Sequence, residues 1–242
     1  MTPLVATFTV HFAATLLHVE RPPMRSRLVA LVVGVVAVLV GLPTGARWLV
    51  AAGATVASVA VLSGYRLLWR IRSTSVGARF GFVVRAYERA HGAFVHGALL
   101  GAVMGASVLP GDWYVAVRSA HLHVTVLGRA GLTLLATVVF LGPTVFRVRI
   151  ADGAEASSAR ALRWGATAVT FAALPLLGSG VGGTSGAVLR VAAGLALVVL
   201  TSAVIVVVRP VVRLARGAER SLSTLLLRHA CWWFAAGPPP TR

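Results

Sequence analysis

Apolar residues along this chain gather into seven long runs that are separated by short segments rich in arginine, glycine and proline. The runs cover about 3–19, 28–45, 48–69, 90–109, 119–146, 164–181 and 187–208. A helix that crosses the roughly 30 Å hydrocarbon core of a bilayer needs about 20 such residues, and tilt absorbs small differences. The pattern predicts an all-α fold, namely a polytopic transmembrane helical bundle of seven spans.

The composition agrees with this class. The chain is 57% hydrophobic and only 12% charged, and its mean hydropathy is +0.86. A soluble domain has about 25% charged residues. The net charge of +17 would suggest nucleic acid as the partner of a soluble protein. Here the arginines lie between apolar runs, so we expect the lipid bilayer as the partner and no nucleic acid.

The arginines also predict a topology. Of the 23 arginines, 17 lie in or next to the segments that follow the first, third, fifth and seventh apolar runs. Three lie in the segments that follow the second, fourth and sixth runs. Basic residues concentrate on the cytoplasmic side of short loops. In a cleaved signal peptide, a basic segment precedes the apolar run, and the first apolar run of this chain has no such segment before it. We therefore expect a multi-pass protein of a bacterial plasma membrane, with its N-terminus outside.

The C-terminal segment is shorter. Residues 221–236 would form a helix of about 24 Å at 1.5 Å per residue, less than a full crossing. We expect an interfacial helix or a partial eighth span there, within one integral-membrane domain over 1–236, followed by a disordered tail over 237–242.

Ionisable residues inside the fifth run are the main functional candidates. His121, His123 and Arg129 occupy it, and such groups are costly in hydrocarbon unless they face a partner, a cofactor or water. His121 and His123 would point about 200° apart on an α-helix, so at most one can ligate a given metal. His11 falls in the same outer half, so it could meet one of them across a cofactor.

Arg129 would lie close to the middle of the membrane and needs an anion, carbonyl groups or a water-filled cavity. All six acidic residues are predicted nearer the membrane surfaces, so a haem propionate is one candidate anion. Snorkelling or capping of carbonyl groups is the alternative.

Other features have plainer interpretations. His18, His91 and His229 are expected at the interface, and residues 85–91 (RAYERAH) are expected to form a solvated helix entrance. Gly97, Gly101 and Gly105 form a stripe of small residues, which is typical of close helix packing. The single cysteine, Cys231, excludes an internal disulfide and a cysteine-based zinc site.

The segment from Tyr87 to Arg149 resembles the N-terminal membrane domain of actinobacterial multicopper-oxidase or nitrite-reductase-like proteins, which is itself similar to haem-copper oxidase subunit I. The family pattern His-x-His-x-Asn-x-x-Gly is matched by HLHVTVLG at 121–128, followed by GPT at 142–144 and RVR at 147–149. Thr125 replaces the asparagine, and Arg129 stands where the family is apolar.

The resemblance implies haem ligation by His121 or His123 near the outer end of an inward-running helix, and the position of His11 in the same outer half makes it the candidate second ligand. It implies an electron-transfer or sensing role beside a redox or oxidase-like partner protein. The later helices and the cupredoxin domain are missing, so a complete enzyme and a copper centre are not expected. A cofactor-free accessory membrane subunit and a copper or small-solute transporter are the alternatives.

Overall fold

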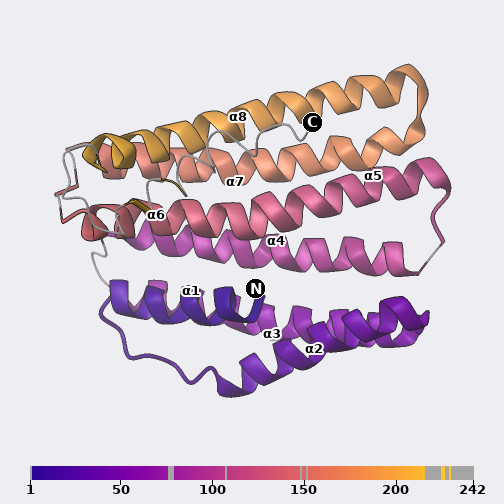
Figure 1. Cartoon of the computed structure of the whole chain (residues 1–242), viewed down its shortest axis with the longest axis horizontal. Helices are drawn as coiled ribbons and strands as arrows, with labels where there is room; N and C mark the ends of the chain where they lie inside the picture. Colours follow the sequence, from indigo (N-terminus) through magenta and orange to yellow (C-terminus); the bar gives the residue numbers. More distant parts are fainter. Residues whose placement is uncertain are drawn as a thin grey trace.

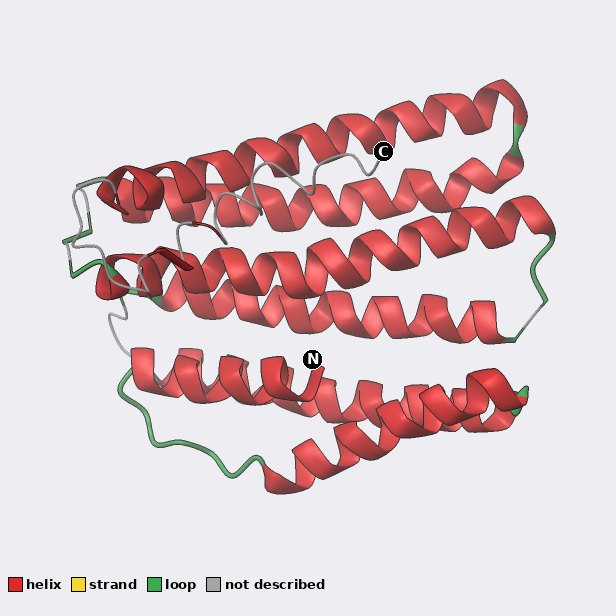
Figure 2. Cartoon of the chain, viewed as in Figure 1, coloured by secondary structure: helices red, strands yellow, loops and turns green. Residues whose placement is uncertain are grey.

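The protein is a bundle of antiparallel helices that run up and down in chain order (Figure 1). The computed structural model describes residues 2–75, 79–106, 108–147, 149–150, 152–215, 225, 226 and 229. Within these residues every regular element is helical (Figure 2). The elements are α1 (Thr2–Leu16), α2 (Arg25–Thr44), α3 (Arg47–Thr74), α4 (Gly81–Gly105), α5 (Gly111–Leu122), the π-helix η1 (His123–Gly131), α6 (Leu132–Val145), α7 (Ala154–Gly178), the 3₁₀ turn η2 (Ser179–Val181) and α8 (Gly183–Ala215).

Three of these elements, α5, η1 and α6, form one continuous helix, so the described chain contains seven long helical segments. Five of them are long and apolar enough to cross a membrane: α2, α3, α5–η1–α6, α7–η2 and α8. Helix α1 has 15 residues, and α4 has three charged residues, Arg85, Glu88 and Arg89, near its N-terminal end. The all-α prediction is confirmed, and a spanning role is supported for five of the seven segments.

The outward-facing surface of the bundle is apolar. Leu39, Val59 and Leu195 are each more than 60% exposed, whereas the buried set contains polar residues such as His91 and Arg129. A water-soluble protein has the opposite distribution, because exposed apolar surface is unfavourable in water. The arrangement indicates a membrane protein.

Alternating helix directions bring the arginine-rich connections together at one end of the bundle. We call this the arginine-rich end: it contains the C-terminal ends of α1, α3, α6 and α8 and the N-terminal ends of α4 and α7, and the connection from α1 to α2 starts there (Figure 1). The opposite, arginine-poor end contains Arg47, Arg118 and Arg190. The predicted separation of the arginines therefore holds in three dimensions.

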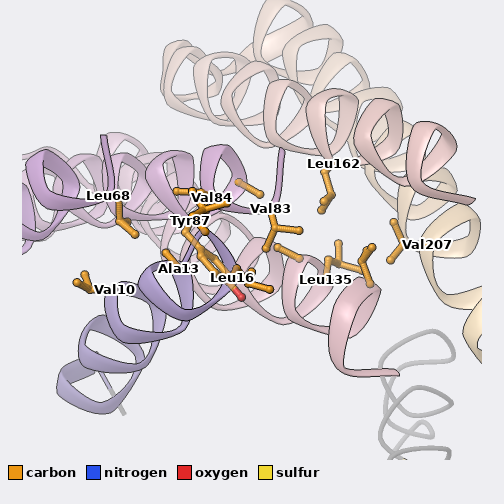
Figure 3. Packing of buried hydrophobic residues seen from close by; sticks show 14 of the residues in the cluster. Val10, Ala13, Leu16, Leu68, Val83, Val84, Tyr87, Leu135, Leu162 and Val207 are labelled. Carbon is orange, nitrogen blue, oxygen red and sulfur yellow. The ribbon is translucent and has the colours of Figure 1, made fainter. Parts of the chain in front are cut away.

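A buried apolar cluster near the arginine-rich end joins six helices: α1, α3, α4, α6, α7 and α8. It includes Val10 of α1, Leu68 of α3, Val83 of α4, Leu135 of α6 and Val207 of α8 (Figure 3). These side chains are at most 2% exposed. The cluster holds the first and last helices against the α4 and α6 pair, on which the candidate site lies.

Two helices begin earlier than the apolar runs indicate. Helix α4 begins at Gly81 and not near residue 90, and α7 begins at Ala154 and not near residue 164. A helix needs only backbone hydrogen bonds, so both helices extend into charged residues that lie outside the apolar runs. The segments predicted over 221–236 and 237–242 lie outside the described residues, apart from residues 225, 226 and 229.

Candidate functional site: a polar seam between two helices

Polar residues recur at every fourth position along the continuous helix from α5 to α6. We call this row the polar seam; it consists of His121, Thr125, Arg129, Thr133 and Thr137. Two of its members, Arg129 and Thr133, are buried, with 4% and 5% of their surface exposed. At 1.5 Å per residue, the row extends over roughly 24 Å, most of the thickness of a bilayer core.

The π-helix explains how one row keeps facing the same neighbour. Four residues of an α-helix turn through 400°, so a row at this spacing drifts by about 40° at each step. A π-helix has about 4.4 residues per turn, so the same four residues fall short of a full turn by about 33°. The rotation of the row in the nine residues of η1 is opposite to its rotation in the α-helical residues before and after them. The two rotations largely cancel, so the row continues to face α4.

Contacts with α4 occur along most of the seam. The Nδ1 of His121 lies 2.8 Å from the carbonyl oxygen of Gly97, and the Nη1 of Arg129 lies 2.9 Å from the Nδ1 of His91. The hydroxyls of Tyr87 and Thr137 are 2.8 Å apart. α4 is thus the helix that supplies partners to the seam.

The glycine stripe of α4 makes room for these polar side chains. A methyl group at Gly97 would collide with the Oγ1 of Thr125, and one at Gly101 would lie 3.2 Å from the Cε1 of His121. A methyl group at Gly105 would meet Val50 of α3 at 3.2 Å. The predicted packing role of Gly97, Gly101 and Gly105 is confirmed.

Hydroxyl groups continue the seam toward the arginine-rich end. The Oγ1 of Thr133 donates to the carbonyl of Arg129 at 2.8 Å, and the Oγ1 of Thr137 donates to the carbonyl of Thr133 at 2.7 Å. Because Thr137 has given its only proton, Tyr87 is the donor in the bond between their hydroxyls. These threonines and Tyr87 are therefore satisfied.

The His91–Arg129 pair lies at the centre of the seam. His91 is fully buried and Arg129 is 4% exposed. The Nδ1 of His91 lies 2.9 Å from both the Arg129 guanidinium and the Tyr87 carbonyl. One ring nitrogen cannot both accept from arginine and donate to a carbonyl. The guanidinium can only donate, so the neutral tautomer with its proton on Nε2 is the one that pairs with Arg129.

That tautomer leaves several donors without acceptors. The Nε2 of His91 and the Nε and Nη2 of Arg129 are all buried and have no hydrogen-bond partner. The Nε2 of His91 faces Gly64 of α3, where an added methyl group would lie 3.3 Å away. The guanidinium carbon also lies 5.8 Å from the centre of the Phe94 ring. The pair therefore has a positive charge and more donors than acceptors.

The nearest buried carboxylate on α4 is already paired. Glu88 is 6% exposed and accepts a hydrogen bond of 2.8 Å from the Nε of Arg72 on α3. Neither of the two ion pairs found among the described residues includes Arg129. The charge of Arg129 is thus not compensated by a carboxylate of the described chain.

The prediction of a solvated entrance at 85–91 holds for Arg85 and Arg89, which are exposed, but is wrong for Tyr87 and Glu88, and the interfacial position predicted for His91 is also wrong. Tyr87, Glu88 and His91 are buried because they share the face of α4 that packs against α3 and the seam. Their spacing of three and four residues was the signal in the sequence. The apolar run begins near residue 90, after Tyr87 and Glu88, so a count of apolar residues alone does not reveal this face.

His121 borders a separate cavity of about 340 Å³ between α2, α3, α4 and α5. Its Nδ1 must carry a proton, because the Gly97 carbonyl only accepts. Its Nε2 is therefore the unprotonated nitrogen that a metal could bind. Phe94, Met104 and Thr125 also line this cavity, and the buried Oγ1 of Thr125 has no partner.

The other predicted ligands lie elsewhere. The Nδ1 of His123 bonds to the Ser119 carbonyl of its own helix at 2.7 Å. His11 is a half-buried residue of α1, a helix that packs against α2, α3 and α4. No group of three His, Cys, Asp or Glu side chains is close enough to hold a metal within the part of the chain that the structure describes. Among the described residues, no hydrogen bond joins any two of His11, His121, His123 and Arg129, and the two-histidine ligand set stays a prediction.

Comparisons with known proteins give no match: no family model, no curated protein and no solved structure is similar to this chain at a significant level. The resemblance of the segment from Tyr87 to Arg149 therefore stays a prediction, and the class of the protein rests on its apolar helices and its buried polar seam.

Proposed function

We propose that this protein is a small-solute transporter and that its solute is a small anion, bound within the membrane by His91 and Arg129. One observation carries the proposal: the buried guanidinium keeps two nitrogens without acceptors and has no carboxylate partner among the described residues. An uncompensated buried charge is costly, and an anion would supply both the negative charge and the missing acceptors.

The cavity beside His91 and Arg129 supports a path by which an anion could reach this pair. The 340 Å³ cavity lies between the pair and the arginine-poor end, and Phe94, which lies beneath the guanidinium, forms part of its wall. Thr125 adds an unpartnered hydroxyl to that wall. An anion entering from this end would leave water through an apolar cavity and meet donors only near the middle of the bundle.

The orientation follows from the separated arginines. The positive-inside rule favours the arginine-rich end in the cytoplasm of a bacterial cell, which would leave the N-terminus outside. The arginine-poor end and its cavity would then face the outside, and anions would enter from there.

Chloride, nitrate and acetate are suitable probes. The purified protein is reconstituted into proteoliposomes loaded with each radiolabelled anion, and release is compared between the wild type, Arg129→Gln and Arg118→Gln. Arg118 is an exposed arginine of the same continuous helix and serves as the matched control. We expect Arg129→Gln to slow release by about tenfold or more, because a hydrogen bond to a charged group contributes about 1.5–3 kcal/mol.

Thermal unfolding in detergent separates transport from folding. A bound anion stabilises the folded state, so chloride in place of gluconate should raise the Tm of the wild type and not that of Arg129→Gln. If Arg129 were only structural, its replacement would lower the Tm in gluconate as well. Absence of release and of stabilisation with all three anions would overturn the proposal.

Haem binding with an electron-transfer or sensing role is a second candidate, favoured by His121. The Gly97 carbonyl fixes its ring and leaves the Nε2 free beside the cavity that Met104 also lines. Imidazole and thioether are both axial ligands of haem iron, and the bound group would supply one-electron chemistry. The chain's contribution would be to orient His121 and to exclude water with apolar walls.

A visible spectrum of the purified protein tests this candidate. Expression with haem supplied should give a Soret band that is lost in His121→Ala and retained in His123→Ala, with Met104→Ala shifting its position. A wild-type protein without the band, or equal loss in both histidine variants, would remove His121 as the ligand.

A further inference from the structure

A second cationic site lies at the arginine-rich end, on the side of the bundle where α4 and α7 meet. Arg85 and Arg89 are one turn apart on α4, and Arg163 of α7 lies beside them, with the Nη1 of Arg89 donating to the Arg163 carbonyl at 3.4 Å. Together they line a recess of about 360 Å³. All three residues are exposed, and neither ion pair within the described residues includes any of them.

The recess opens into an apolar groove. Arg85 and Arg89 also line a larger cavity of about 720 Å³ between α4 and α7. The small residues Gly92, Ala93 and Ala173 line the floor of this groove. Leu99 and Leu174, each about 60% exposed, lie at its open side. Glu88 also borders it, but its carboxylate is bonded to Arg72 and is compensated.

The dimensions match one leaflet of a membrane. From Arg89 to Leu100 the groove follows eleven residues of α4, about 16 Å at 1.5 Å per residue. Half of a hydrocarbon core of about 30 Å has nearly this thickness. A charged recess at one end and an apolar groove of leaflet length at the other suit a molecule with an anionic head and an alkyl chain.

We propose that the recess formed by Arg85, Arg89 and Arg163 binds the phosphate headgroup of an anionic phospholipid, and that one acyl chain of this lipid lies in the groove between α4 and α7. Arginine pairs well with phosphate because its planar fork matches the oxygens. Basic pockets between membrane helices are known to take up such headgroups. This site is separate from His91 and Arg129 and does not depend on the proposed anion transport.

The test is lipid binding by the detergent-purified full chain. Phosphatidylglycerol and phosphatidylcholine with the same acyl chains are added in turn, and bound lipid is counted by native mass spectrometry. Wild-type protein should retain phosphatidylglycerol in preference. The double variant Arg85→Gln/Arg89→Gln should lose about 25-fold in affinity, since each arginine near a membrane surface contributes about fivefold.

Two further variants make the test specific. Arg66→Gln/Arg70→Gln removes the same charge from an exposed pair one turn apart on α3, outside the groove, and should leave binding unchanged. Gly92→Leu places a side chain in open space on the groove floor and should reduce binding while leaving the Arg85, Arg89 and Arg163 recess unaltered.

Three results would overturn the proposal. Equal loss in the α3 double variant would mean a general attraction to basic surface. Unchanged binding in Gly92→Leu would place the acyl chain elsewhere. Displacement of the lipid by millimolar inorganic phosphate would make the recess a site for free phosphate and not for a lipid.

Discussion

Two neighbouring helix pairs use glycine for different purposes. In the α2–α3 pair, a methyl group at Gly34 would lie 2.7 Å from backbone atoms of Gly53 and Ala57, so glycine there lets two backbones approach. In the pair formed by α4 and the polar seam, glycine makes room for the side chains of His121 and Thr125. The same small-residue spacing thus builds an apolar contact in one place and a polar one in the other.

The difference affects what each pair can tolerate. Backbone atoms cannot move aside without disturbing a whole helix, whereas a side chain can change rotamer. The α2–α3 pair therefore serves as a rigid contact. The polar seam contains buried polar side chains, which a small number of hydrogen bonds hold in place.

The largest effect is expected at the rigid contact. Gly34→Ala should destabilise the protein by about 3 kcal/mol or more, above the usual range for added methylene groups, because the new methyl group meets only backbone. Folded yield and Tm in detergent measure this. Gly194→Ala of α8, where an added methyl group meets nothing within 4 Å, is the control and should behave as the wild type. A stable Gly34→Ala protein would contradict the close backbone approach.

The second-largest effect on stability is expected at Glu88, the buried carboxylate of α4 that pairs with Arg72. Glu88→Gln should destabilise by about 2 kcal/mol, since Arg72 loses its partner but is itself 27% exposed and keeps some solvation. Tm measurements should show no comparable loss for Glu155→Gln.

Glu155 is the matched control because its pair with Arg79 lies in a more open place. The hydrogen bond and the charge of Glu155 raise the pKa of the Arg79 guanidinium, but this arginine is freely solvated. Equal effects of Glu88→Gln and Glu155→Gln would mean that the burial of Glu88 has no energetic consequence.

A smaller effect is expected where glycine faces a side chain. Gly97→Ala should cost about 1–2 kcal/mol, because the new methyl group would collide with the Oγ1 of Thr125, a side chain that can move. Adding Thr125→Ala should restore most of the stability, and a double-mutant cycle on Tm measures the coupling. Additive losses would show that the two residues do not meet.

The smallest effect is expected at the end of the seam. Tyr87→Phe removes the hydroxyl that donates to Thr137 and should cost about 1 kcal/mol, the usual net contribution of one hydrogen bond. Thr137 keeps its own bond to Thr133, so the rest of the row should be unchanged. Chloride-dependent stabilisation should persist in Tyr87→Phe, and its loss would extend the proposed anion site to Tyr87.

The sequence by itself determined the helical class, the number of long helices and the clustering of arginines at one end. These properties depend on local hydrophobicity and on chain direction, which an alternating pattern records directly. It also identified Arg129 as a residue that needs a partner, because burial of a charge in an apolar run is costly wherever the chain goes.

Only the tertiary structure decided which partner Arg129 has. His91 lies 38 residues away on another helix, and a single sequence carries no record of that contact. The close approach of α4 to the π-helix also appears only in three dimensions, where an added methyl group at Gly97 would meet Thr125 and one at Gly128 would meet Ala93. Local patterns specify helices, whereas side-chain partners arise from the relative rotation and depth of helices, which the packing of the whole bundle determines.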